Sequence, residues 1–253
     1  MSKKLVIGNW KMNPESFAVA KAIAQKTREI SMKLKNTEVV VCPPFSFIPA
    51  CVSRNQPAAF HLGAQSVSFE ESGPHTGEVG IKMLANLGVE YIITGHSEER
   101  AAGDTDEMVS KRIFRIVEGG LTAVVCVGEK NRDDDGVHLE FLRKQIKGTF
   151  ANIPEDKAKR IILAYEPIWA IGAKEAMLPE QVYEMSLFVK KIFADVFGHE
   201  AGHKVRVLYG GSVNFRNAGD IIKVGKVDGL LVGRESVNMP GFKELLKAVD
   251  AIE

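Results

Sequence analysis

The segment Arg160-Ile161-Ile162-Leu163-Ala164-Tyr165-Glu166-Pro167-Ile168-Trp169-Ala170-Ile171-Gly172 joins a short apolar run to a carboxylate. The run at 160–164 is typical of a buried strand, so Glu166 falls where a strand passes into a loop. Apolar side chains follow it and exclude water, which disfavours the charged carboxylate and makes it a stronger base. Pro167 fixes its own φ and keeps Glu166 extended. A solvated or structurally paired carboxylate remains the alternative for this segment alone.

Seven other short runs have the same strand-like character, and a helix-like pattern follows most of them. The repeat of roughly thirty residues suits βα units with a parallel sheet. Eight units without a linker in 253 residues predict one α/β domain over 1–253, a closed (β/α)8 barrel. An open doubly wound sheet is the alternative, but its glycine-rich dinucleotide turn is missing after the first run. The predicted strands are Leu5–Gly8, Glu38–Cys42, Phe60–Ala64, Tyr91–Thr94, Thr122–Val127, Arg160–Ala164, Lys204–Tyr209 and Asp228–Val232.

The composition favours a soluble globular protein, with 45% hydrophobic and 26% charged residues. A formal charge of +1 provides no global field for nucleic acid or an anionic membrane. No stretch is long enough to cross a bilayer, and the apolar run near the start is too short for a signal peptide. Cys42, Cys51 and Cys126 cannot all pair with one another and lack metal-ligand spacing. We therefore expect a cytoplasmic protein in a reducing compartment, with no nucleic-acid or membrane partner.

Polar side chains at the strand ends are the candidate chemical groups, because the carboxyl ends of barrel strands converge on one mouth. Lys11 provides a cation there, His96 an imidazole and Glu166 a carboxylate. Individually, Lys11 can be a solvated lysine and His96 a structural histidine. The chain has no Gly-x-Ser-x-Gly turn and no Walker-type loop, which argues against a serine hydrolase and an NTPase. The other polar residues at these ends are Asn9, Gln65, Ser97, Glu98, Glu129 and Ser212.

Three glycine-bearing turns late in the chain indicate a phosphorylated substrate. They contain Gly172, Gly210-Gly211-Ser212 and Gly233. Backbone N–H groups at such turns bind anions, and phosphate sites in these barrels follow the seventh and eighth strands. The acidic stretch at 132–136 is interpreted as a solvated turn and helix start and not as a metal site.

Six segments together closely resemble the triosephosphate isomerase family, and they extend from the first predicted strand to the eighth. The resemblance implies the TIM-barrel fold and interconversion of dihydroxyacetone phosphate and D-glyceraldehyde 3-phosphate in glycolysis and gluconeogenesis. It also implies a homodimer and no metal or organic cofactor. The segments are Gly8-Asn9-Trp10-Lys11-Met12-Asn13, Gly95-His96-Ser97-Glu98, Cys126-Val127-Gly128-Glu129, Ala164–Gly172, Tyr209-Gly210-Gly211-Ser212-Val213 and Asp228-Gly229-Leu230-Leu231-Val232-Gly233.

The resemblance also assigns roles, which are those described for the family. Glu166 would move the proton between the two carbons, and neutral His96 would polarise the carbonyl and shuttle protons between the oxygens. Lys11 and Asn9 would stabilise the enediolate, and Glu98 would support the site from behind. The phosphate would be bound by Asn9, Lys11, Gly172, Ser212, Gly233 and Arg234, the last four through backbone N–H groups.

A mobile lid is implied as well. Its closure would bring a hydrophobic clamp, Ile171 and Leu231, over Glu166 and exclude water. The lid residues are Pro167, Ile168, Trp169, Ala170, Ile171, Gly172, Ala173, Lys174, Glu175 and Ala176.

Four differences from the family pattern stand out. Ala173-Lys174-Glu175 replaces the usual Thr-Gly-Lys in the lid, and Leu178 replaces a threonine, which removes a helix cap. Arg234 replaces a second glycine after Gly233. Glu99 replaces an arginine near the place where the loop Ser66–Gly80 of a second subunit would dock, so the dimer contact is expected to differ. Schiff-base chemistry at Lys11 and an inert binding scaffold remain alternatives to the isomerase.

Overall fold

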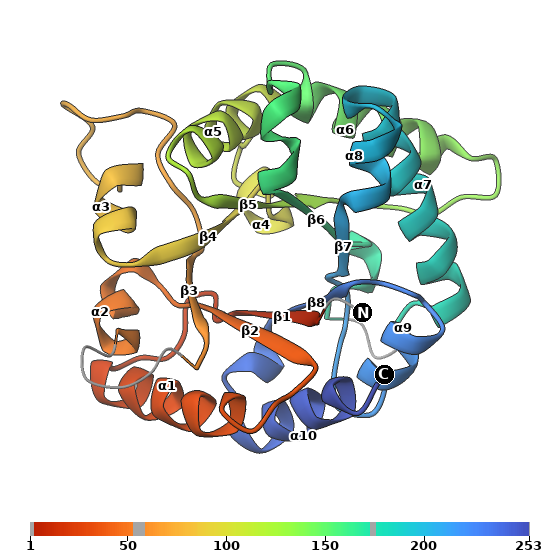
Figure 1. The fold of residues 1–253 in the computed structure, drawn as a ribbon. Helices are drawn as coiled ribbons and strands as arrows, with labels where there is room; N and C mark the ends of the chain where they lie inside the picture. The colour runs from red at the N-terminus through yellow and green to blue at the C-terminus, as the bar shows by residue number, and fades with distance from the viewer. Residues whose placement is uncertain (1–2, 53–58, 173–175, 253) are drawn as a thin grey trace.

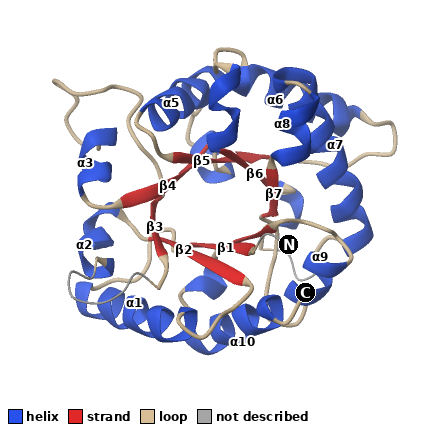
Figure 2. Cartoon of the chain, in the orientation of Figure 1, coloured by secondary structure: helices blue, strands red, loops and turns tan. Residues whose placement is uncertain are grey.

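A computed structural model describes residues 3–52, 59–172 and 176–252. In the described part, eight parallel strands pair in chain order, and β1 pairs with β8 to close a barrel (Figure 2). Helices surround this barrel on the outside (Figure 1). The predicted closed (β/α)8 barrel is therefore confirmed, and the open doubly wound sheet is excluded. The strands are β1 Lys4–Asn9, β2 Thr37–Cys42, β3 His61–Ala64, β4 Val89–Thr94, β5 Thr122–Val127, β6 Ile161–Tyr165, β7 Arg206–Tyr209 and β8 Gly229–Val232.

The helices follow the strands as the βα pattern requires. Their bounds are α1 Phe17–Ser31, α2 Ile48–Cys51, α3 Ile81–Asn86, α4 Ser97–Ala101, α5 Asp106–Glu118, α6 Val137–Phe150, α7 Pro179–Phe197, α8 His199–Lys204, α9 Ala218–Lys223 and α10 Met239–Asp250. Short 3-10 helices are η1 Phe45–Phe47, η2 Glu155–Arg160, η3 Ile168–Ala170 and η4 Arg234–Ser236.

The predicted strand bounds are wrong by one or two residues at several ends. Arg160 belongs to η2, and Lys204 ends α8, so β6 and β7 begin later than predicted. Phe60 and Asp228 immediately precede their strands. Arg160 and Lys204 are charged residues that end the preceding helical turns, and the apolar pattern along the sequence does not mark where such a turn gives way to the strand.

The core consists of two layers because successive strand residues face opposite sides of the sheet. Ile7 and Leu231 point into the barrel interior, whereas Val6 and Leu230 pack under the helices. Both faces are buried, which explains why the strands are continuously apolar. The three cysteines are unpaired and buried, and Cys126 lies in the interior layer as a small hydrophobic residue.

Helix starts agree with the interpretation of the loops. Leu178 precedes α7 and makes no side-chain cap, as its apolar side chain predicts. The Asp133 carboxylate accepts the backbone N–H groups of Val137 and His138 at the start of α6, which confirms the turn and helix start. Within 3–52, 59–172 and 176–252, no group of three or more histidine, cysteine or acidic side chains is placed to hold a metal ion.

The loop from Ser66 to Gly80 joins β3 to α3 and projects beyond the ring of helices (Figure 1). Residues 71–78 are all exposed. None of the helices in the described part of the chain has the length and hydrophobicity that a membrane span requires.

Candidate active site

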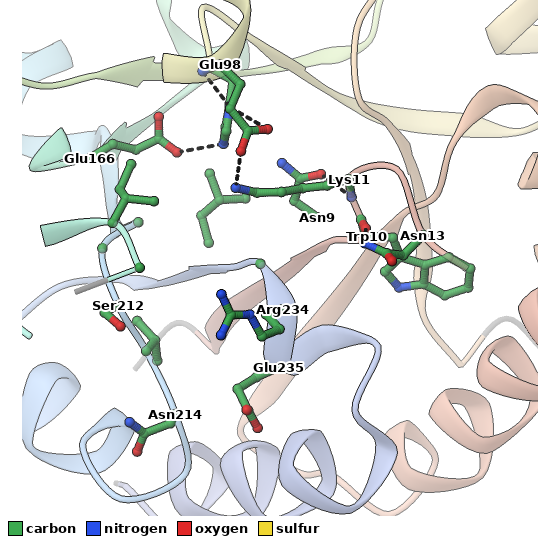
Figure 3. Close-up of a pocket in the computed structure, with 18 residues that line it drawn as sticks. Asn9, Trp10, Lys11, Asn13, Glu98, Glu166, Ser212, Asn214, Arg234 and Glu235 are labelled. Atoms are coloured by element: carbon green, nitrogen blue, oxygen red, sulfur yellow. Dashed lines mark hydrogen bonds and ion pairs between the residues drawn. The ribbon is translucent and has the colours of Figure 1, made fainter. Parts of the chain in front are cut away.

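A cavity of about 500 Å3 opens at the carboxyl ends of the strands (Figure 3). Side chains and turns that follow β1, β4, β6, β7 and β8 line it. The fold thus brings together residues from the first βα unit and the last, which no local sequence pattern does. Of the predicted site residues, those that line the cavity are Asn9, Lys11, His96, Glu98, Glu166, Ile171, Gly172, Ser212, Leu231, Gly233 and Arg234.

Glu166 follows β6 directly and is only 2% exposed. Its backbone N–H donates to the carbonyl of Val127, which extends the strand pairing by one residue. Two glycines make room for it. A Cβ on Gly128 would lie 1.7 Å from the Glu166 carbonyl oxygen, and one on Gly210 would lie 2.8 Å from the Glu166 Cγ. These close approaches fix the position of the carboxylate.

His96 ends the turn after β4, and its Nε2 lies 3.2 Å from Oε1 of Glu166. The backbone N–H of Glu98 donates to His96 Nδ1 at 3.2 Å. A backbone N–H can only donate, so Nδ1 must be unprotonated and the ring proton must be on Nε2. The imidazole is therefore neutral and presents an N–H to Glu166.

The environment of Glu166 raises the pKa of its carboxyl above the ordinary value of 4.5. Burial is the main cause, and it outweighs the opposing effects of His96, the Ser97 backbone N–H and Lys11. Water-free surroundings destabilise the carboxylate relative to the acid, so its affinity for a proton is increased. This is the property that a general base requires.

The pH dependence of stability should reveal this raised pKa. The pKa of Glu166 is higher in the folded chain than in the unfolded chain, so ionisation of this carboxyl lowers the free energy of unfolding as pH rises through the folded pKa. Below pH 4.5 the carboxyl is protonated in both states and this loss is absent. We expect Glu166→Gln to gain stability relative to the parent chain as pH increases from 4 to 8. The free energy of unfolding of Glu166→Gln should rise, relative to that of the parent, by about 1.4 kcal/mol for each pKa unit by which folding raises the pKa of Glu166. The altered contact with Ser97 adds only a pH-independent offset.

Denaturant unfolding at several pH values measures this difference. Glu200→Gln, at an exposed glutamate of α8 whose pKa the Lys204 hydrogen bond lowers, is the matched control and should show no such rise. A Glu166→Gln difference that is flat between pH 4 and 8 would show that the folded carboxyl titrates normally.

Lys11 is held in place by its own backbone contacts. Its φ is +53°, which is unusual for a residue other than glycine. Asn9 Oδ1 accepts its backbone N–H at 3.0 Å, and the Gln65 amide donates to its carbonyl at 2.9 Å. The role of Gln65 in positioning Lys11 was not predicted, because the two residues belong to different βα units.

The Lys11 ammonium bonds Oε1 of Glu98 at 2.6 Å (Figure 3). Partial burial raises the pKa of Glu98, but the hydrogen bond and charge of Lys11 outweigh it, so the pKa lies below its ordinary value. Glu98 is therefore ionised and forms an ion pair with the Lys11 ammonium. Glu98 lies beside Lys11 at the open side of the cavity, where its side chain is 61% exposed, and not behind the site as the resemblance implied.

The opposite side of the cavity is formed by the glycine-bearing turns. Gly172 has a φ of +72°, and Ser212, Gly233 and Arg234 line the same space. A Cβ on Gly233 would lie 3.5 Å from Cε of Lys11, so the β8 turn and the Lys11 side chain adjoin. This arrangement combines backbone N–H groups with a fixed cation, which suits a phosphate.

The first part of the predicted lid is attached to Glu129, a buried residue that follows β5. Its Oε1 accepts hydrogen bonds from the Tyr165 hydroxyl at 2.8 Å and from Trp169 Nε1 at 3.0 Å. The Glu129 carbonyl also accepts the Ile168 N–H at 2.9 Å. Glu129 was predicted only as a polar residue at a strand end, and its contact with the lid was missed. Ala173, Lys174 and Glu175 lie outside the described residues.

At the far end of the lid, the Tyr209 hydroxyl accepts the backbone N–H of Met177 at 3.3 Å. Between the two attachments, Ile171 lines the cavity together with Leu231 and Glu166. The remaining predicted lid residues, Pro167, Ile168, Trp169, Ala170 and Ala176, are not among those that line it.

Comparison with known proteins agrees with this geometry. The family model described as triosephosphate isomerase matches residues 4–249. Triosephosphate isomerase of Endomicrobium trichonymphae is 36% identical over 252 residues, covering 98% of this chain and 99% of the relative. The enzyme of Idiomarina loihiensis is 37% identical over 246 residues, covering 96% and 97%. That of Chloroherpeton thalassium is 34% identical over 252 residues, covering 99% and 100%. The barrel and the cavity described above, together with these full-length matches, show that this chain belongs to the triosephosphate isomerase family.

Proposed function

We propose that this chain interconverts dihydroxyacetone phosphate and D-glyceraldehyde 3-phosphate, a step of glycolysis and gluconeogenesis. The observation that carries the proposal is the pairing of a buried carboxylate, Glu166, with the Nε2–H of neutral His96 at 3.2 Å. One group accepts a proton and the other donates a hydrogen bond, and both line one cavity with Lys11.

In the proposed mechanism the substrate carbonyl acidifies the neighbouring C–H, so no cofactor is required. Glu166 takes that proton, and the electron pair moves to the carbonyl oxygen to form an enediolate. His96 Nε2–H, which bonds Glu166 in this structure, turns to the oxygen and moves protons between the two oxygens. Protonated Glu166 then returns its proton to the adjacent carbon. Lys11 and Asn9 stabilise the negative charge while it exists.

The phosphate is proposed to lie against the turns at Gly172, Ser212, Gly233 and Arg234. We further propose that 167–176 closes as a lid and that Ile171 and Leu231 then cover Glu166. Closure replaces the water around the carboxylate with apolar surface, which strengthens the base. It requires the Trp169 indole to change its contact with Glu129, or both residues to move together.

A coupled assay with D-glyceraldehyde 3-phosphate tests the proposed activity. We expect turnover without added metal and no loss of activity with a chelator. The same protein treated with substrate and borohydride tests Schiff-base chemistry at Lys11, which the 2.6 Å pair with Glu98 disfavours because an ammonium is not nucleophilic. A folded protein that lacks turnover would contradict the isomerase, and a covalent adduct at Lys11 would favour the Schiff-base alternative.

We also propose a homodimer that forms through the Ser66–Gly80 loop. The projection of this loop and the exposure of 71–78 support it. Glu99, at the base of the loop, is half-buried; burial raises its pKa, against the effects of a Ser66 hydrogen bond and Arg112. Glu99 therefore interacts with its own loop, which is how we expect it to alter the contact between subunits.

Sedimentation velocity is expected to show a dimer at micromolar concentration. Shortening 71–78 to a glycine–serine turn should give a folded monomer, since the loop projects from its own barrel. Glu200→Gln, on the exposed surface of α8, is the control and should leave the dimer intact. A parent chain that stays monomeric, or a shortened chain that stays dimeric, would contradict an interface at this loop.

A cytoplasmic location is proposed on the basis of the three unpaired, buried cysteines, which suit a reducing compartment. A fluorescent fusion in the source cell would test it, and secretion of the fusion would contradict it.

A further inference from the structure

Arg234 follows Gly233 at the start of η4 and is exposed at the edge of the cavity. Figure 3 shows its guanidinium turned into the cavity, on the side that faces Ser212. Within the described residues, no hydrogen bond or ion pair involves this guanidinium.

Glu235 is the obvious partner for Arg234, but it faces elsewhere. Its Oε2 accepts a hydrogen bond from Asn238 Nδ2 at 3.4 Å and packs against Gly241, where a Cβ would lie 2.0 Å from that oxygen. The side chain points away from Arg234 (Figure 3). The adjacent carboxylate therefore does not neutralise the guanidinium.

The charges described around the cavity leave Arg234 as the unpaired cation. Lys11 is paired with Glu98, and Glu166 bonds His96. The three glycine-bearing turns offer backbone N–H groups, which carry only partial charges. A guanidinium adds a full charge and two parallel donors whose geometry matches a tetrahedral anion.

We propose that Arg234 is a specificity-determining residue whose guanidinium contacts the substrate phosphate and makes this site select a doubly charged tetrahedral anion. This inference rests on the proposed function, because the proposed function places the substrate phosphate on the side of the cavity where Arg234 lies. It extends the expected contact of the Arg234 backbone N–H to the side chain. Backbone donors alone discriminate weakly between singly and doubly charged groups, whereas an unpaired cation discriminates by charge.

Steady-state kinetics of Arg234→Ala and Arg234→Lys test the proposal. We expect Arg234→Ala to raise KM about tenfold, equivalent to about 1.4 kcal/mol, with kcat within about twofold of the parent. Arg234→Lys should lie between the two, because it keeps the charge and loses the paired donors. Added monovalent salt should raise KM more steeply for the parent than for Arg234→Ala.

Arg216→Ala is the matched control. Arg216 is an exposed arginine in the neighbouring β7–α9 loop, where it stacks on Phe215 and does not line the cavity. It removes the same charge from the same end of the barrel, so KM should stay within about twofold of the parent. Thermal unfolding of each variant shows that it is folded.

Calorimetric titration with sulfate and with methyl sulfate tests the anion site without turnover. Both probes are tetrahedral at sulfur, but sulfate carries two negative charges and methyl sulfate carries one. The parent and Arg216→Ala should prefer sulfate, and Arg234→Ala should lose most of that preference. A parent that lacks isomerase activity but shows this change would contradict the proposed function and leave the Arg234 site standing. Equal sulfate preference in the parent and Arg234→Ala, or a KM that is unchanged or lower in Arg234→Ala, would overturn the role of Arg234.

Discussion

Glu166→Asp is expected to reduce kcat by about 10²- to 10⁴-fold, the range that a positioned general base contributes. The substitution keeps the carboxylate but shortens the side chain by one methylene. The backbone cannot follow, because Gly128 and Gly210 pack directly against Glu166 and the N–H of Glu166 is bonded to Val127. A displacement of about 1 Å is enough to cost about 10²-fold in rate.

The effect should appear in kcat and leave KM within about threefold, because the substitution leaves unchanged the turns at Gly172, Ser212 and Gly233 that we propose hold the phosphate. Steady-state kinetics in both reaction directions measures it. Glu244→Asp, on the outer surface of α10, is a matched control for shortening a glutamate and should be silent. A kcat within fivefold of the parent would remove Glu166 from the role of base.

The fold could be predicted from the sequence because each strand is buried on both faces. Continuous apolar runs such as Thr122–Val127 must be buried on both faces. When helical patterns separate such runs, few arrangements other than a parallel sheet covered by helices achieve this burial. Closure was predictable from the number of units. The first residues of β6 and β7 could not be predicted. Whether Arg160 and Lys204 begin these strands or end η2 and α8 depends on hydrogen bonds that form only in the packed chain.

The site divides in the same way. Glu166, His96 and Lys11 could be selected because each is the polar residue at a strand end and belongs to a recognisable segment. The tautomer of His96 could not, since it depends on the Glu98 N–H that α4 directs at Nδ1. The contact of Glu129 with Trp169 and that of Gln65 with Lys11 join different βα units, so no spacing along the chain reports them.

Lys11→Met should lower kcat/KM by about 10²- to 10³-fold, comparable to removal of one preorganised donor to a developing oxyanion. Methionine has a similar length and no branch at Cβ, so it tolerates the φ of +53° about as well as lysine does. The backbone contacts with Asn9 and Gln65 remain available. The loss therefore reports the charge and not the shape of the loop.

Both kinetic constants should change, because the Lys11 side chain adjoins the Gly233 turn, which we propose holds the phosphate, and lines the same cavity as Glu166. Loss of Lys11 leaves Glu98 without the charge that lowers its pKa, and the orphaned carboxylate then repels an anionic substrate. The pair contributes little to folding, since Glu98 is 61% exposed and solvent screens it. The unfolding midpoint of Lys11→Met should accordingly stay close to that of the parent.

Lys204→Met provides the matched control, because Lys204 bonds Glu200 at 2.5 Å on the exposed surface of α8, away from both the cavity and the Ser66–Gly80 loop. It breaks an equivalent ion pair far from the cavity, and kcat/KM should not change. A second variant, Lys11→Arg, keeps the charge but moves it, because the guanidinium is larger and planar. If Lys11→Met retained kcat/KM within tenfold of the parent, the cation would be structural, and the negative charge of the enediolate would have to be stabilised by His96, Asn9 and the backbone N–H groups alone.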